Sequence, residues 1–144
     1  MTDEHWNWQT DRSIPSETGA GRGIQEELLR EMEAAGWSRH DRFSVRLAME
    51  EAVVNAIAHG NHYDTAKLVR VRCWLGPDLV RIEVHDEGSG FDPACVPDPT
   101  DPERLQCPCG RGLMLMRHFM TRVEHTHSGN TVVLEKRRAA DSEE

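Results

Sequence analysis

Two short segments with alternating apolar side chains constrain the fold of this chain more than any other feature. A turn at Gly76-Pro77-Asp78 separates them. Successive side chains of a strand point to opposite faces of a sheet, so each segment buries one face only. The alternating residues are Val69, Val71, Cys73 and Leu75 before the turn, and Val80, Ile82 and Val84 after it. A sheet of this kind needs helices packed over its apolar face.

Helical patterns elsewhere in the chain supply that cover. Apolar residues recur at helical spacing in residues 16–35, and Gly36 is suited to end the helix. A second helix is predicted from the cap residue Ser38 to His59, with Gly60 as its stop. A third helix is predicted to begin near Gly112.

The remaining segments complete one domain over residues 1–144. Residues 5–9 alternate like a short edge strand, and residues 121–127 and 131–136 predict a hairpin. The order of elements predicts an α+β fold, a two-layer α/β sandwich whose mixed, mostly antiparallel sheet carries about three helices on one face. A proline-rich loop, about residues 91–111, is long enough to be a lid, and residues 137–144 form a charged, flexible tail.

Composition excludes several classes of function. A formal net charge of -8 argues against direct binding to nucleic acid or to anionic lipid. No apolar run approaches the roughly 20 residues of a membrane span, and residues 1–7 lack the pattern of a signal peptide. Cys73, Cys95, Cys107 and Cys109 form no recognisable disulfide framework. We therefore expect a cytoplasmic protein.

The predicted second helix carries a polar column beside its apolar arc. Glu51, Asn55 and His59 are spaced i, i+4 and i+8, so an α-helix places them in line, whereas Glu50 points to another side. A carboxylate and a carboxamide at the margin of a core can meet an ion, a water or a ligand. The same pattern is also typical of a solvated stripe on an amphipathic helix.

A second motif, Asp86-Glu-Gly88-Ser-Gly90, follows the strand pattern directly. Asp86 has the parity of the apolar residues of that strand, so its carboxylate is predicted to point to the core side. A carboxylate there can accept a hydrogen bond from an exocyclic amine, and glycines let a flat ring approach the backbone. An ordinary turn rich in Gly and Asp is the alternative.

A third motif, Gly110-Arg111-Gly112-Leu113, stands where the predicted lid meets the third helix. Exposed backbone N–H groups and the positive end of a helix suit a phosphate chain. Glycines there also let a lid hinge. Without a ligand, the same residues are a loop end beside a helix start.

In this order the three motifs resemble the N, G1 and G2 boxes of the gyrase, histidine-kinase and MutL type ATPases, which share the Bergerat ATP-binding fold. The resemblance spans Phe43 to Lys136. The stretches 51–60 and 110–116 are especially similar to the anti-sigma-factor serine/threonine kinases of the RsbW type. The chain has no space for the phospho-acceptor helix pair of a histidine kinase or for the second domain of gyrase and MutL.

The resemblance implies a role for each matching residue. Glu51 is implied as the general base toward the acceptor serine of a partner protein, and Asn55 as a residue that helps to hold Mg²⁺. Asp86 is implied to bond the adenine amino group of ATP. The other implied ATP-binding residues are Gly88 and Gly90 in the adenine pocket, and His59, Gly110, Arg111, Gly112 and Leu113 at the lid and phosphates.

The function implied is that of an ATP-binding anti-sigma factor and serine/threonine kinase. Its partners would be a sigma factor, which it sequesters, and an anti-sigma-factor antagonist, which it phosphorylates; relatives of this type commonly form homodimers. Cys107-Pro108-Cys109 departs from the family pattern. The lid arginine for the γ-phosphate is left open between Arg104 and Arg111.

Two other functions fit parts of the sequence. A non-catalytic, ATP-gated regulatory binding module would use the same pocket without transferring phosphate. An S-adenosylmethionine-dependent methyltransferase is the more distant alternative, because Val84-x-Asp86-x-Gly88-x-Gly90 overlaps the glycine motif of that family. In a methyltransferase, however, that motif runs into a helix, and here a proline-rich loop follows it.

Overall fold

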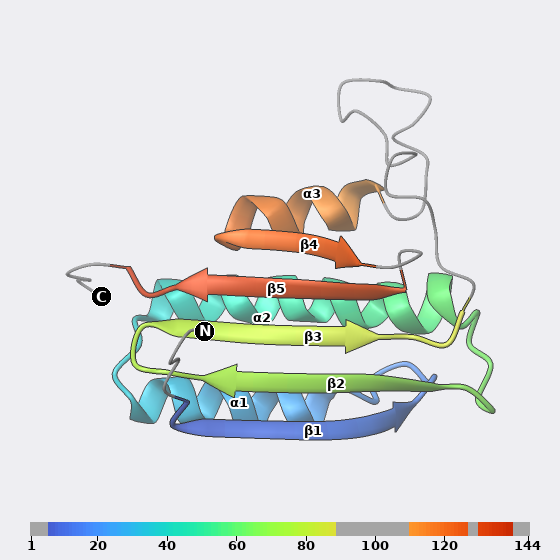
Figure 1. The fold of residues 1–144 in the computed structure, drawn as a ribbon, viewed down its shortest axis with the longest axis horizontal. Coiled ribbons are helices and arrows are strands. Elements are labelled where there is room, and N and C mark those ends of the chain that lie inside the picture. The colour runs from blue at the N-terminus through green and yellow to red at the C-terminus, as the bar shows by residue number, and fades with distance from the viewer. Residues whose placement is uncertain (1–5, 89–109, 127–129, 140–144) are drawn as a thin grey trace.

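Five antiparallel strands form one sheet in the order β1-β2-β3-β5-β4 (Figure 1). The computed structural model describes residues 6–88, 110–126 and 130–139. All four described strand pairings are antiparallel. The prediction of a mostly antiparallel sheet is therefore confirmed, but the described strands show no parallel pair that would make the sheet mixed. The strands are β1 (Trp8–Pro15), β2 (Leu68–Leu75), β3 (Leu79–His85), β4 (Arg122–Thr126) and β5 (Thr131–Arg137).

The hairpin of β2 and β3 forms as its alternation predicts. Val71 pairs with Val84 and Cys73 with Ile82, so the apolar residues of both strands share one buried face. The N-terminal strand was predicted over residues 5–9 but runs from Trp8 to Pro15 along β2. Its extra residues are mostly polar because β1 is an edge strand that buries little of its surface.

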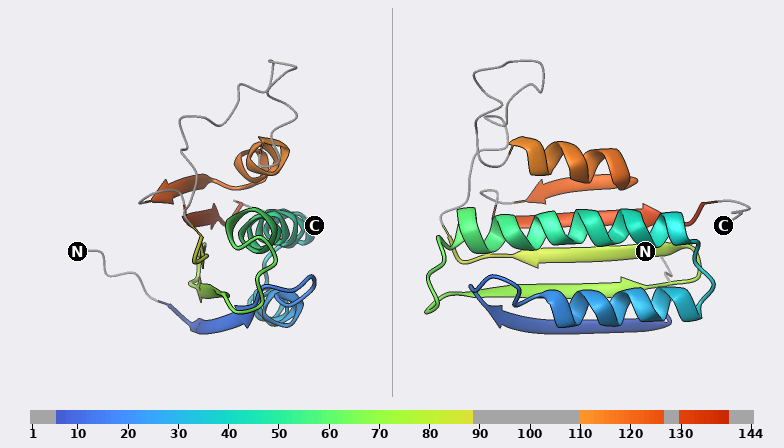
Figure 2. Two further views of the ribbon diagram at one scale, coloured as in Figure 1. Left: turned by 90° about the vertical axis from the view of Figure 1, so that its right-hand side faces the viewer. Right: turned by 180° about the vertical axis from the view of Figure 1, so that it is seen from behind.

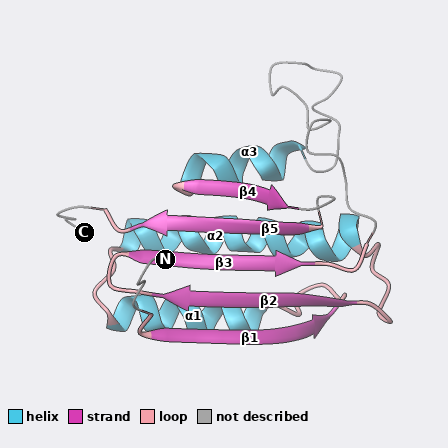
Figure 3. Ribbon diagram, in the orientation of Figure 1, coloured by secondary structure: helices cyan, strands magenta, loops and turns pink. Residues whose placement is uncertain are grey.

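Helices α1 (Arg22–Ala34), α2 (Arg39–Asn55) and α3 (Gly110–Phe119) cover the apolar face of the sheet, with α2 between the other two (Figures 2 and 3). None of the described helices is long and apolar enough to cross a membrane. The core fills the space between these helices and the sheet, and Cys73 lies in it as a packing residue. Burial raises the pKa of this thiol to about 12.

Two helix boundaries differ from the predicted ones. Helix α1 begins at Arg22, not near residue 16, because Ser16 is buried and donates from its Oγ to the Lys67 carbonyl oxygen at 2.7 Å. Gly19 then turns the chain with a φ of 83°. Helix α2 is capped by Ser38 as predicted, but its last turn is the π-turn η1 (Ala56–Gly60).

Candidate functional site

The elements that carry the three motifs end or begin at one edge of the molecule. The C-terminal end of α2 with η1, the residues after β3, and the start of α3 lie at the right-hand side of Figure 1. In the end-on view of Figure 2, η1 and the end of β3 lie next to each other, and α3 lies on the side of α2 away from α1. Three segments that are far apart in sequence therefore reach the same place in the fold.

Asp86 is the buried acid of this edge. It follows β3 directly and is 7% exposed, so the predicted orientation toward the core side is confirmed. Its backbone N–H donates to the Asn130 carbonyl oxygen at 2.9 Å, and its Oδ1 accepts the Gly88 N–H at 2.9 Å. Burial raises the pKa of the carboxyl, although the hydrogen bond from Gly88 opposes that shift. Its Oδ2 has no hydrogen-bond donor within the described residues.

Gly60 and Gly88 let the end of η1 and the turn after β3 touch. A Cβ on Gly60 would lie well under 3.0 Å from the Asp86 carboxylate. A Cβ on Gly88 would meet the Gly60 carbonyl oxygen equally closely and would lie 3.1 Å from Asp86 Oδ1. Neither site has room for a side chain, so the two glycines are required by close approach of the backbones rather than by a positive φ.

Asn61 links the segments that meet at this edge through side-chain hydrogen bonds. The sequence pattern did not predict this role. It is 0% exposed, and its Oδ1 accepts the backbone N–H of Glu87 at 2.8 Å. Its Nδ2 donates to Ser16 Oγ at 2.9 Å and to the Leu68 carbonyl oxygen at 3.1 Å. The side chain thus fastens the turn after β3 to the end of η1. An Asn after a helix-ending Gly reads in sequence as an exposed turn residue, which hides this role.

Glu51 and Asn55 are both half-buried on α2. At about 100° per residue they lie on the opposite flank of the helix from Arg46. That flank faces α3, because α2 lies between α1 and α3 and Arg46 lines the cavity on the α1 side (Figure 2). Burial raises the pKa of Glu51, with a smaller contribution from the negative charge of Glu50.

His59 is exposed, and the π-turn changes its place in the column. A π-turn holds more residues than an α-turn, so His59 does not continue the line of Glu51 and Asn55 that ideal α-helical spacing predicts. The turn closes when the Asn61 N–H donates to the Ala56 carbonyl oxygen at 2.8 Å. Its widening brings Gly60 against Asp86.

The third motif is described in its backbone alone. Gly110, Arg111, Gly112 and Leu113 form the first turn of α3, so the predicted helix start is confirmed, and their roles toward phosphate stay predictions. Gly90, the lid segment up to residue 109, and its three cysteines lie outside the described residues.

Comparison with known proteins agrees with this arrangement. The sequence model described as "Histidine kinase-like ATPase domain" matches residues 14–136. The anti-sigma F factor of Oceanobacillus iheyensis is 34% identical over 83 residues, which cover 56% of each chain. That of Clostridium perfringens (strain SM101) is 30% identical over 99 residues, which cover 65% of this chain and 70% of the relative. The serine/threonine-protein kinase BtrW of Bordetella bronchiseptica is 30% identical over 86 residues, or 58% of this chain and 61% of that protein.

A solved structure shares the fold. The RsbU and RsbW domains of Rv1364c from Mycobacterium tuberculosis superpose with a TM-score of 0.60 at 18% identity. The match covers 92% of this chain and 32% of that one. Because the identity is low, this likeness supports the fold alone.

Proposed function

The chain belongs to the histidine kinase-like ATPase domain family, as its three motifs predict, and from this we propose that it is an ATP-dependent serine/threonine kinase and anti-sigma factor. It would phosphorylate an anti-sigma-factor antagonist and sequester a sigma factor. Relatives that are named anti-sigma F factors and a serine/threonine kinase support the proposal. The observation that carries it is the buried carboxylate of Asp86, held against Gly60 at the end of the helix that bears Glu51 and Asn55.

Asp86 is the proposed adenine-binding residue. Its Oδ1 accepts the Gly88 N–H, while its Oδ2, which has no donor among residues 6–88, 110–126 and 130–139, would accept a hydrogen bond from the exocyclic amino group of adenine. A buried carboxylate without a second donor is costly, so a ligand amine there gains more than it would in water. Guanine presents a carbonyl oxygen at the corresponding ring position and would repel the carboxylate. The site therefore favours ATP over GTP.

Glu51 is the proposed general base. The oxygen of the acceptor serine attacks the γ-phosphorus of ATP, the serine proton passes to the Glu51 carboxylate, and the bond from phosphorus to the leaving oxygen of ADP breaks. A raised pKa suits this role, because it brings the proton affinity of the carboxylate closer to working pH. Half-burial on the α3 flank leaves the carboxylate reachable by an incoming side chain.

Asn55 fits a magnesium ion brought in with ATP. Its amide supplies an oxygen ligand of the hard type that Mg²⁺ prefers, one helical turn beyond Glu51 on the same half-buried flank. When bound, the ion neutralises charge on the phosphate oxygens. The first turn of α3, with Arg111, and the exposed His59 are the proposed contacts of the phosphate chain.

The alternatives rank lower. The antiparallel sheet and the family match give no support to a methyltransferase. A non-catalytic module would keep the adenine contact and lose only transfer, so it is an outcome of the experiment below. The homodimer and the cytoplasmic location remain predictions, as does the assignment of the whole chain to one domain.

The test is incubation of the chain with labelled ATP and purified candidate antagonist proteins. We expect label on a serine or threonine of one antagonist, with transfer abolished in Glu51→Gln and ATP affinity kept. Glu50→Gln, one residue away on the other flank, is the matched control and should transfer normally at saturating acceptor. ATP binding without transfer to any antagonist would contradict the kinase and favour the ATP-gated module. Undiminished transfer by Glu51→Gln would remove that residue from its role.

A further inference from the structure

A groove runs between α1 and α2, on the flank of α2 that faces away from Glu51. A cavity of about 270 Å³ forms one part of it, and a neighbouring hollow of about 290 Å³ shares Glu26 and Arg46 with it. The α1–α2 groove is defined by Arg22, Arg46, Val53, Val54, Ile57 and Tyr63.

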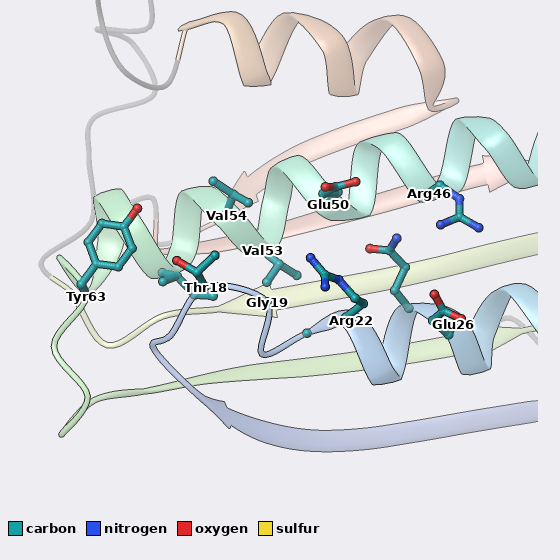
Figure 4. Close-up of a pocket in the computed structure, with 12 residues that line it drawn as sticks. Thr18, Gly19, Arg22, Glu26, Arg46, Glu50, Val53, Val54 and Tyr63 are labelled. Atoms are coloured by element: carbon teal, nitrogen blue, oxygen red, sulfur yellow. The ribbon is translucent and has the colours of Figure 1, made fainter.

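The floor of the groove is apolar and partly open to water. Val53 and Ile57 are buried, whereas Val54 is 46% and Tyr63 57% exposed. Figure 4 shows Tyr63 at one end of the cavity and Arg46 at the other, with Arg22 reaching up from α1 between them. His62 and Tyr63 have φ values of 52° and 59°, a left-handed conformation that is unfavourable for non-glycine residues. The ring of Tyr63 is thus exposed to solvent on an unfavourable backbone conformation.

The rim of the groove is rich in arginine although the chain is acidic. Five arginines and three glutamates line the cavity and the neighbouring hollow together. Arg22, Arg30 and Arg46 form no ion pair within the described part of the chain, whereas Arg42 lies 4.0 Å from Glu33. The cavity itself is lined by two arginines and two glutamates, so the excess of positive charge comes from the neighbouring hollow. In a chain of net charge -8, this local excess is complementary to an anionic partner.

The N-terminus of α1 adds two groups that point to a ligand. Its cap residue Gly21 has no side chain and its first turn holds no acidic residue, so neither a side-chain cap nor a negative charge there offsets the positive helix end, although the Arg22 N–H donates to the Gly19 carbonyl oxygen at 3.1 Å. Gln25 lines the same cavity and is only 8% exposed, yet its amide has no hydrogen-bond partner among the described residues. The amide lies at the wall of the open cavity, so it can hydrogen-bond a group that enters there.

We propose that the α1–α2 groove binds an acidic, amphipathic segment of a partner protein. An Asp or Glu side chain of that segment lies between Arg22 and Arg46 at the N-terminus of α1, and an aliphatic side chain packs on Val54 and Tyr63. That the partner is the sigma factor or the antagonist rests on the proposed function. A partner held here leaves the α3 flank, with Glu51 and Asn55, open to nucleotide.

The first test uses the isotope-labelled full chain and a short synthetic peptide of Leu, Ala, Asp and Glu. We expect amide and side-chain shifts at Gln25, Val54 and Tyr63, and binding at least about tenfold tighter than that of the same peptide with Lys in place of every acidic residue. The double variant Arg22→Glu/Arg46→Glu should lose this preference. Arg137→Glu, an exposed residue at the end of β5, is the matched control. Equal binding of both peptides, or shifts confined to the open face of the sheet, would overturn the proposal.

The second test separates the groove from the kinase proposal. With a phosphorylated antagonist in hand, the double arginine variant should raise the KM for that protein about tenfold or more while the ATP affinity and the kcat stay unchanged. An unchanged KM would refute the groove and leave the kinase intact. If no antagonist is phosphorylated but the acidic peptide still binds the groove, the kinase proposal fails and the docking site stands.

Discussion

Replacing Gly88 by alanine tests the contact that holds the candidate site together. The added Cβ would lie well under 3.0 Å from the Gly60 carbonyl oxygen, a backbone atom that no rotamer change can move aside. The turn after β3 and the end of η1 must therefore separate by about 1.5 Å or more to reach an ordinary contact. Overpacking of this kind costs about 1–3 kcal/mol, or about 3–9 °C in Tm for a domain of this size. The same movement displaces the Asp86 carboxylate, so ATP affinity should fall by about tenfold or more.

The matched control is Gly23→Ala. A Cβ on Gly23, inside α1, meets no atom within 4 Å, so alanine should stabilise the helix by about 0.5–1 kcal/mol and leave ATP affinity unchanged. Differential scanning calorimetry and isothermal titration with ATP measure both quantities for each variant. If the two variants behaved alike, the close approach of Gly88 to Gly60 would not be the constraint that shapes the site.

Three further predictions follow from the same edge of the molecule. Burial raises the pKa of Asp86 above 3.8, so the folded state holds this proton more tightly than the unfolded state, and stability falls as pH rises from 3.8 through the raised pKa. Asp86→Asn should therefore raise the Tm of the nucleotide-free chain at pH 7 but not at pH 3. The same substitution should weaken the binding of ATP far more than the binding of GTP. Unchanged ATP affinity would contradict the adenine assignment. Asn61→Ala leaves the Glu87 N–H without its partner and removes the donations to Ser16 and Leu68, so it should lower stability by about 1–3 kcal/mol; an unchanged Tm would show that these bonds are not decisive. Since the pKa of Glu51 is raised above 4.5, phosphoryl transfer should decline as pH falls through that raised pKa, and a pH profile that shows no such decline would count against Glu51 as the base.

The sequence pattern predicts those parts of the fold that depend on residues close together along the chain. The alternation around the turn at residues 76–78 gives both strands and their buried face, and the parity of Asp86 gives the burial of its carboxylate. The cap at Ser38 places the start of α2, because its side chain accepts the Asp41 N–H three residues later. Each of these features depends on neighbours within a few residues or on the period of a strand.

Features that depend on distant partners could not be predicted in this way. Asn61 bonds Ser16, 45 residues away, and the Glu87 N–H, 26 residues away, so its burial exists only once three segments have met. The late start of α1 has the same origin, because Ser16 is committed to the Lys67 carbonyl oxygen. The π-turn is a further case: Gly60 predicts the end of the helix, but nothing in residues 56–59 predicts a π-turn, and the fit of Gly60 against Asp86 is a tertiary contact.

Helix α2 carries polar residues on two separate flanks, and this explains why its sequence does not show one apolar face and one polar face. Toward the sheet it is continuously apolar, while its α3 flank presents Glu51 and Asn55 and its α1 flank presents Arg46. A helix with one function would need one polar stripe facing solvent; here the polar residues divide into two stripes on opposite sides of the apolar face. A carboxylate and a carboxamide on one flank suit a nucleotide with its metal ion, and an arginine on the other suits an acidic protein segment. The partner segment and ATP would then both contact α2, each on its own flank, and would not compete for the same surface.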